Sequence, residues 1–306
     1  MPFCGVAEVN FKMNTYWSQY VQYTEELYRS RALRFHDGNK ELWLSLIGVQ
    51  DGMNVLEVGC GSGIFCHRIK TYLPNTTVTG IDLDTGHIEY ARKKSADLGI
   101  DCNFVNGDAT ALPFEENTFD LCFSYTVIDF CEPTLFINQQ RRVLKPGGTL
   151  TILNILGGGI NSEMWKPEEA DEEKNLFDKL WAQADKNELS HIKKHPISLR
   201  DYPANLQKAG LKDIKMDVLA AASYNPDSSN VSDFTALEQI NENRFCELCS
   251  VQKAKSMAPT ALTDTEFETL VSFINRKYDQ RIAKYQSGEK LWDFSAGITF
   301  AASGKK

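Results

Sequence analysis

The sequence predicts an α/β fold: a Rossmann-like, seven-stranded and mostly parallel sheet with helical insertions that form a cap. Three observations favour this fold. Short apolar segments alternate with helical segments over residues 53–156, which is the pattern of parallel strands joined by crossover helices. A glycine-rich turn over residues 59–63 directly follows the first of these strands. Residues 292–302 alternate well enough to add a reversed last strand.

The first half of the chain contains a regular series of expected elements. Two helices are expected before the sheet, at residues 15–34 and 39–49. Strands and helices then alternate, with strands expected at 53–58, 76–82, 102–105, 119–124 and 149–156, and helices at 64–73, 88–98 and 133–144. Lys145-Pro-Gly-Gly148 ends the third of these helices, because proline cannot continue a helix and glycine permits a tight return to the sheet.

The second half is less regular. Residues 167–188 are charged and helical, and residues 198–209 are expected to form a helix with Ser198 as N-cap and Gly210 as C-cap. A sixth strand is expected at 214–222, followed by long helical stretches at 228–253 and 263–286. Four parts follow from these elements: a helical cap segment (1–50), a Rossmann-like domain (51–222, with 157–197 partly an insertion), a helical cap insertion (223–290) and the final strand (291–306).

Charge and composition indicate which kinds of binding partner are not expected. The 306 residues include 33 basic and 41 acidic ones, which gives a net charge of −8. An acidic chain repels a phosphate backbone, so nucleic-acid binding is not expected. The sequence has no basic start followed by an apolar run, and no stretch approaches the roughly 20 apolar residues that span a bilayer. A cytoplasmic setting without a membrane span is expected.

Cysteines and histidines do not predict a metal site. The eight cysteines lie mostly in apolar segments, where a reduced thiol behaves as a small hydrophobic group. Cys246 and Cys249 fall within an expected helix, where such a pair more often packs than binds zinc. His191 and His195 have helical i, i+4 spacing but lack a third ligand. We therefore expect no bound metal.

The glycine-rich turn carries the strongest chemical signal. It reads Val55-Leu-Glu-Val-Gly59-Cys-Gly61-Ser-Gly63 and leads from a buried strand into a helix. Glycines let the backbone approach a ligand, and the helix N-terminus offers it free N–H groups. The spacing is G-x-G-x-G rather than the G-x-G-x-x-G of dinucleotide-binding proteins. Glu57 would repel a pyrophosphate but attract the amino group of an amino-acid-like ligand.

These motifs resemble those of the class I S-adenosylmethionine-dependent methyltransferases. The resemblance covers residues 53–156 and is strongest to the small-molecule branch related to ubiquinone and menaquinone methyltransferases. The later motifs agree in order and spacing; they are Gly80-Ile-Asp82, Gly107-Asp-Ala109, Leu112-Pro-Phe114, Phe119-Asp-Leu-Cys-Phe-Ser124 and Arg142-Val-Leu-Lys-Pro-Gly-Gly148. The resemblance implies S-adenosylmethionine as the cofactor, bound at the carboxyl ends of the first four strands.

The resemblance also implies roles for residues after the second and third strands. Asp82 would bond to the ribose hydroxyls, as acidic residues at this place do in nucleotide-binding relatives. Leu83 would pack on the adenine. Asp108 would accept from the adenine amino group, and the Ala109 N–H would donate to a ring nitrogen.

The methionine part of the cofactor would lie over the glycine turn. Gly59, Gly61 and Gly63 would approach it together with Glu57, and Ser124 lies where the family contacts this part. Tyr28 and Arg29 would hold its carboxylate if the N-terminal helix folds over the site. The alternative is a purely structural role, in which glycines at strand–helix turns allow close packing and Asp82 or Asp108 serves as a helix cap or turn residue.

The expected function is transfer of the methyl group to a small organic acceptor by in-line displacement, for which positioning matters most. Where the acceptor must lose a proton, Asp129 and Tyr125, after the fourth strand, are the candidate bases. Asp129 is equally compatible with a cap or surface role before Pro133. Two other functions stay open, a non-catalytic S-adenosylmethionine-binding sensor or interaction protein and a nucleotide-dependent dehydrogenase. The extra helices are compatible with an acceptor pocket or with a homodimer contact.

Overall fold

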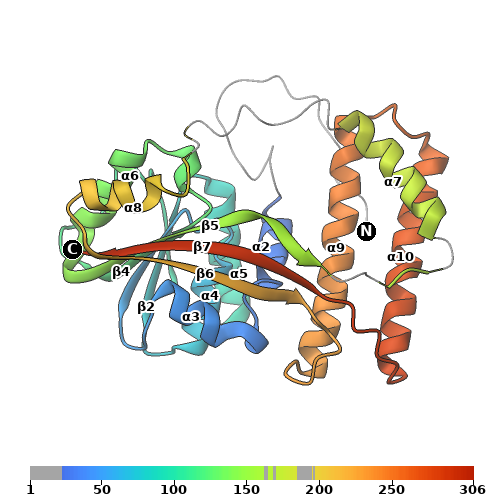
Figure 1. Ribbon diagram of the computed structural model, residues 1–306, viewed down its shortest axis with the longest axis horizontal. Coiled ribbons are helices and arrows are strands. Elements are labelled where there is room, and N and C mark those ends of the chain that lie inside the picture. Colours follow the sequence, from blue (N-terminus) through green and yellow to red (C-terminus); the bar gives the residue numbers. More distant parts are fainter. Residues whose placement is uncertain (1–22, 162–164, 168–169, 185–194, 196) are drawn as a thin grey trace.

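A seven-stranded sheet forms the centre of the molecule. The structure is a computed structural model, which describes residues 23–161, 165–167, 170–184, 195 and 197–306. The strand order is β3-β2-β1-β4-β5-β7-β6 (Figure 1). The strands are β1 (Asn54–Val58), β2 (Thr77–Asp82), β3 (Asn103–Asn106), β4 (Phe119–Tyr125), β5 (Leu144–Asn161), β6 (Lys212–Tyr224) and β7 (Ser295–Lys305). Only β7 runs antiparallel to its neighbours, so the predicted mostly parallel, seven-stranded sheet with a reversed last strand is confirmed.

Helices cover both faces of the sheet. On one face lie α3 (Lys40–Ile47), α4 (Ile64–Tyr72) and α5 (Thr85–Leu98), whose core includes Trp43, Phe65 and Phe123. The other face carries α6 (Pro133–Val143) and α8 (Asp201–Lys208) around Phe136 and Phe300. Two short 3-10 helices are η1 (Asp37–Asn39) and η2 (Ile128–Phe130). Both faces are therefore buried, which explains why the central strands read as continuous apolar runs.

Three long helices form a bundle beside the sheet (Figure 1). They are α7 (Ala170–Ala184), α9 (Asp233–Met257) and α10 (Asp264–Gln286), and they pack around a separate core that includes Leu180, Val251 and Leu270. The helix α2 (Thr24–Ala32) lies between this bundle and the sheet, in contact with α9, α4 and α5. Among the described helices, none combines the length and the apolar content that crossing a bilayer requires.

A buried ion cluster joins the bundle to the sheet. Arg281 of α10 donates to Asp227, which follows β6, and to Asp293, which precedes β7, at 2.8 Å in each case. All three side chains are at most 3% exposed. Asp227 also accepts from the backbone N–H groups of Leu291 and Trp292. Because the cluster ties α10 to both segments that enter the sheet, it fixes where the bundle lies.

Several expected boundaries differ from those in the structure. β5 begins at Leu144 and extends to Asn161, because β7 pairs with it far beyond the apolar segment. Ser198 is not the N-cap of α8: the helix begins at Asp201, and Ser198 donates its hydroxyl to the carboxylate of Asp201. α3 packs within the sheet's own core and α7 joins α9 and α10. The cap considered below therefore consists of α2 and the three-helix bundle.

Candidate functional site

The carboxyl ends of four parallel strands meet at one edge of the sheet. β1 lies between β2 and β4, and β3 flanks β2. Residues that the sequence spreads over 70 positions are thereby brought together, since parallel neighbours end at the same edge. The predicted residues on this edge are Gly59, Gly61 and Gly63 after β1, Asp82 and Leu83 after β2, Asp108 and Ala109 after β3, and Ser124 in β4.

The glycine turn needs glycine for two reasons. Gly59, Gly61 and Gly63 have φ values of 74°, 52° and 85°, in the left-handed region that side chains disfavour. Neighbours also fill the space that a Cβ would need. A Cβ on Gly59 would lie 2.4 Å from the Val127 side chain, and one on Gly61 would lie 2.6 Å from Leu27 of α2. The turn is thus packed under α2 on one side and under the segment after β4 on the other.

Asp82 holds the turn in this shape. Its Oδ2 accepts from the Gly61 N–H at 2.8 Å, and its Oδ1 accepts from the Asp84 N–H at 2.9 Å. Burial raises the pKa of Asp82, while the two backbone donors act in the opposite direction. Each carboxylate oxygen can accept a second hydrogen bond, so the group keeps capacity for a ligand hydroxyl.

An apolar surface lies next to hydrogen-bonding groups beyond Asp82. The Leu83 side chain is 63% exposed, unusual for a large apolar residue that follows a buried strand. Asp108 is exposed, and its Oδ1 accepts from the N–H and hydroxyl of Thr110, both at 2.7 Å. Ala109 packs at the edge of the core. This combination suits a flat ring that carries an amino group.

Glu57 and Ser124 lie beneath the turn. Glu57 is 2% exposed and accepts from the Cys66 thiol of α4 at 3.0 Å. Burial raises its pKa to about 8, so the carboxyl group is largely protonated at neutral pH. Ser124 is fully buried, and its hydroxyl has no partner within the described part of the chain. Glu57 is thus held beside α4 by its bond to Cys66, and its role toward a ligand amino group stays a prediction.

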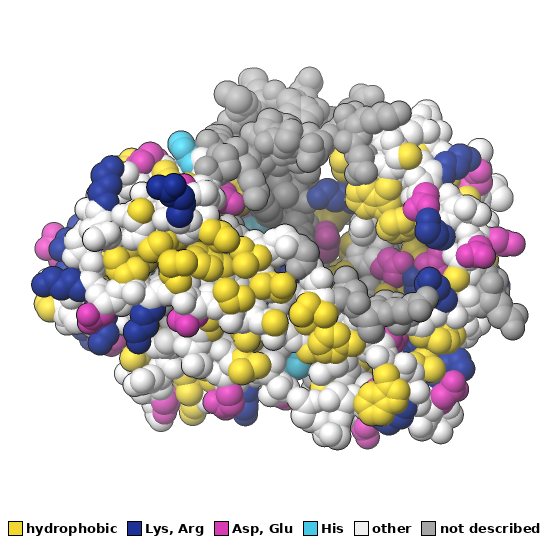
Figure 2. All heavy atoms as spheres, viewed as in Figure 1, with side chains coloured by type: hydrophobic (Ala, Val, Ile, Leu, Met, Phe, Trp, Pro, Cys, Tyr) yellow, Lys and Arg dark blue, Asp and Glu magenta, His cyan; other side chains and the backbone are white. Residues whose placement is uncertain are grey.

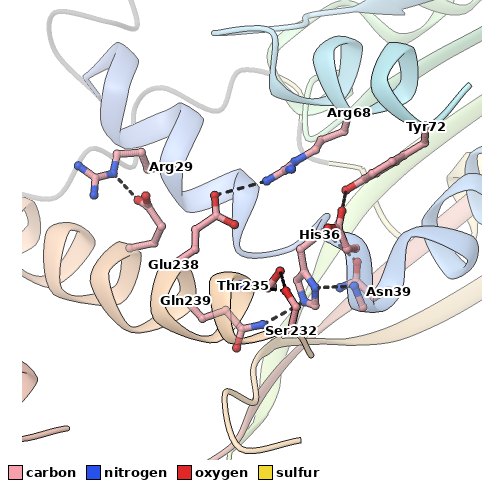
Figure 3. A network of polar contacts seen from close by, with 12 residues as sticks. Arg29, His36, Asn39, Arg68, Tyr72, Ser232, Thr235, Glu238 and Gln239 are labelled. Atoms are coloured by element: carbon pink, nitrogen blue, oxygen red, sulfur yellow. Dashed lines mark hydrogen bonds and ion pairs between the residues drawn. The ribbon is translucent and has the colours of Figure 1, made fainter. Parts of the chain in front are cut away.

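Tyr28 and Arg29 of α2 both have partners on neighbouring helices. Arg29 is paired with Glu242 of α9 and its guanidinium lies 3.7 Å above the Phe245 ring (Figure 3). The Tyr28 ring packs against His67 and Tyr90. A role of these two residues in holding the cofactor's carboxylate stays a prediction, and it would require Arg29 to exchange its bond to Glu242 for one to the ligand.

Another face of α2 points to the turn. Leu27 covers Gly61, Arg31 follows it at the helical i+4 position, and Arg34 lies in the turn just after α2. The Arg31 guanidinium lies 5.3 Å from the centre of the Tyr125 ring, and Arg34 donates to the Tyr125 hydroxyl at 2.9 Å. The sequence analysis did not select these two arginines. Their spacing from Leu27 could have indicated that they lie on the same side of the N-terminal helix as this leucine.

The two candidate bases lie on opposite faces of the sheet. Tyr125 packs in the core on the α4 side, beside the two arginines. Asp129 is 7% exposed and accepts from Asn154, whose amide also donates to Tyr202 of α8. Thr126, between them, has a φ of 61°, a costly conformation for a β-branched residue. Tyr125 thus borders α2, whereas Asp129 lies in a polar cluster with Asn154 and Tyr202 of α8.

Polar contacts connect α9 to the elements around the turn (Figure 3). Glu238 pairs with Arg68 of α4 at 3.7 Å, and Gln239 lies 3.4 Å from His36 before η1. The described residues contain no group of three His, Cys, Asp or Glu side chains placed to hold a metal ion. His191 lies outside the described residues, and His195 uses its backbone N–H to bond to the Asp129 carbonyl.

The comparisons with known proteins identify the family. A family model described as a methyltransferase domain matches residues 49–210. The chain is 34% identical over 117 residues to a ubiquinone/menaquinone biosynthesis C-methyltransferase of Ruegeria sp. (strain TM1040), covering 37% of this chain and 47% of that protein. It is 33% identical over 119 residues to a malonyl-[acyl-carrier protein] O-methyltransferase of Erwinia pyrifoliae, covering 38% and 43%. The alignments thus span less than half the length of these curated relatives.

A solved structure shows the same fold over almost the whole chain. It is phosphoethanolamine N-methyltransferase 2 of Haemonchus contortus. The superposition covers 97% of this chain and 61% of that enzyme's chain, with a TM-score of 0.53 and 18% sequence identity. The family model covers more than half of the chain, and its range contains the glycine turn, Asp82 and both sheet faces. The chain belongs to the methyltransferase domain family, and its fold is that of the class I S-adenosylmethionine-dependent methyltransferases.

Proposed function

We propose that this protein binds S-adenosylmethionine at the edge formed by β1, β2, β3 and β4 and transfers its methyl group to a small organic acceptor. The observation that carries the proposal is the bond from the Gly61 N–H to Asp82, with the exposed Leu83 beside it. This arrangement provides a carboxylate for two ribose hydroxyls and an apolar surface for a purine. Asp108 and the Ala109 N–H lie next along the edge for the amino and ring nitrogens.

The chemistry asks mainly for positioning. The sulfonium of the cofactor supplies the activation, and in-line displacement proceeds once the acceptor atom lies behind the methyl carbon. Ser124 and the glycine turn would contact the methionine part, which places the methyl group near the strained Thr126 after β4. Of the two expected bases, Tyr125 lies on the same side as the turn and α2. We therefore retain Tyr125 as the residue nearest the acceptor and assign Asp129 a supporting role.

The bundle closes the acceptor side in this proposal. α2 packs over Gly61, and α9 contacts α2 through the pair Arg29–Glu242 and α4 through the pair Arg68–Glu238. Figure 2 shows the surface hollowed between the sheet and the bundle, with basic and acidic side chains along its walls. A site between these two bodies would exclude water and orient a small molecule.

Isothermal titration tests the cofactor, and product release tests catalysis. We expect S-adenosylmethionine and its demethylated product S-adenosylhomocysteine to bind, and NADH not to bind, because the glycine spacing is short and no pyrophosphate site is present at the turn. Binding of NADH with none of S-adenosylmethionine would overturn the proposal. Binding without S-adenosylhomocysteine release, across acceptors of varied chemistry, would instead favour a non-catalytic sensor.

A further inference from the structure

Two arginines, Arg31 of α2 and Arg34 in the turn that follows it, converge on the carboxyl end of β4. Arg34 donates to the Tyr125 hydroxyl at 2.9 Å, and the Arg31 guanidinium lies 5.3 Å from the centre of the same ring. Tyr125 is directly followed by Thr126, whose left-handed backbone marks the point where the chain leaves the sheet. Arg31 thus lies one helical turn beyond Leu27, which covers Gly61. The pair lies beside the proposed methyl donor rather than beneath it.

Neither arginine has a carboxylate partner among the described residues. Other arginines of the same region are paired: Arg29 with Glu242, and Arg68 with Glu238. The groups that face Arg31 are Arg34 in the turn after α2, Tyr125 on β4 and Cys246 on α9, and none of these is a carboxylate. Burial, followed by the charge of Arg34, lowers the pKa of Arg31 to about 10, so the guanidinium keeps its charge. Within the described part of the chain, these two neighbouring cations therefore have no carboxylate to neutralise them, in a partly buried place.

A bound cofactor would increase this imbalance. S-adenosylmethionine carries a sulfonium and an ammonium against a single carboxylate, so it is itself a net cation. The nearby Glu57 offers little compensation, because burial raises its pKa to about 8. Partly buried like charges in a region of low dielectric are costly unless a counter-charge enters. An oxyanion would supply that counter-charge, and guanidinium groups bind carboxylate and phosphate oxygens with two parallel N–H donors.

We propose that Arg31 and Arg34 bind an oxyanionic group, a carboxylate or a phosphate, of the methyl acceptor. The substrate class is accordingly a small organic acid or phosphate ester whose nucleophilic atom lies within a few bonds of the anion. Tyr125 fixes the direction of Arg34, and Cys246 of α9 borders Arg31 on the bundle side. This inference rests on the proposed function, since it assumes that the neighbouring turn holds the methyl donor.

The test uses the full chain loaded with saturating S-adenosylhomocysteine and titrated with inorganic phosphate or acetate at constant ionic strength. We expect at least one of the two anions to bind the loaded protein at millimolar concentrations. Arg31→Gln and Arg34→Gln should each weaken that binding by about tenfold or more, the effect expected for one charge-assisted hydrogen bond. Arg31→Lys should retain part of it. Arg200→Gln, which removes one charge from the exposed start of α8, should leave it unchanged.

Each other result contradicts the inference in a distinct way. If the anion weakens S-adenosylhomocysteine binding but not that of methylthioadenosine, which lacks the amino-acid part, the arginines hold the cofactor's own carboxylate. If neither anion binds the loaded protein, or if Arg200→Gln weakens binding as much as Arg31→Gln does, the pair is no acceptor site. Failure of S-adenosylhomocysteine itself to bind the wild-type chain would overturn the proposed function instead.

Discussion

Asp82 connects two of the strand ends that form the candidate site. Its carboxylate accepts from the backbone N–H groups of Gly61 and Asp84 and has capacity left for a ribose. We expect Asp82→Ala to weaken S-adenosylhomocysteine binding by about 1.5–3 kcal/mol, the range for hydrogen bonds to a charged group. Isothermal titration measures this directly. Asp101→Ala is the matched control, because it removes an equal charge from the exposed turn before β3. Wild-type affinity in folded Asp82→Ala would rule out the ribose role.

Glu57 should give the protein a pH-dependent stability. Its pKa is raised from 4.5 to about 8 by burial, so between these values the folded state holds a proton that the unfolded state has lost. The free energy of unfolding therefore falls as pH rises through this window, by at most about 1.4 kcal/mol per pH unit, and levels off above the folded pKa. Glu57→Gln removes this contribution.

Denaturant unfolding at several pH values between about 6 and 9 measures the effect. The difference in unfolding free energy between Glu57→Gln and wild type should grow in favour of the variant up to about pH 8, then stay constant. Other titrating groups cancel in this difference. Parallel profiles for the two proteins would show that Glu57 is ionised throughout.

The glycine turn allows a matched test at the scale of an element. Gly61 and Gly48 both have positive φ, 52° and 84°, so alanine costs either position about 1–2 kcal/mol of stability. Only at Gly61 does a Cβ meet a neighbour, at 2.6 Å from Leu27, whereas the space around Gly48 is open to 4 Å. Gly61→Ala must therefore displace α2 as well.

We expect both variants to lose stability, Gly61→Ala more than Gly48→Ala, and only Gly61→Ala to weaken S-adenosylhomocysteine binding, by about tenfold or more. Thermal unfolding and titration of the two variants provide the comparison. Adding Leu27→Ala to Gly61→Ala should restore part of the affinity, because it reopens the space under α2. Equal binding by Gly61→Ala and Gly48→Ala would mean that α2 does not close over the cofactor.

The sheet was predictable because its signals are local. Each signal determines the structure of only a few neighbouring residues. These signals are the periodicity of each strand, the glycines at 59, 61 and 63 and the helix-ending Pro146. The face of α2 that covers the turn could not be predicted. Tyr28, Arg29 and Arg31 are all polar or amphipathic, so any of them is compatible with a ligand-binding site. Which one faces the turn is decided by Glu242 and Phe245, more than 200 positions away on α9. The length of β5 likewise depended on a distant partner, β7.

At the scale of the whole molecule, α2 and the bundle should respond to the ligand together. α9 contacts both α2 and, through Glu238, the helix that starts at the glycine turn. We expect cofactor product plus an anionic acceptor mimic to slow hydrogen exchange in residues 24–32 and in α9, because closure orders the contacts between them. α6, on the far side of the sheet, is the internal control. Unchanged exchange in both α2 and α9 would argue that the bundle serves another purpose, such as a contact between copies.

The position of β7 has a consequence for synthesis of the chain. β7 fills the place between β5 and β6, and the ribosome makes α7, α8, β6, α9 and α10 before it. At a synthesis rate of roughly 5–20 residues per second, one long edge of β5 stays unpaired for on the order of ten seconds before β7 is made. During that time β5 and the nascent β6 present open edges that can pair with other chains. We expect nascent-chain folding to complete only when Ser295–Lys305 has left the exit tunnel, and yields in cells to depend on how well that interval is chaperoned.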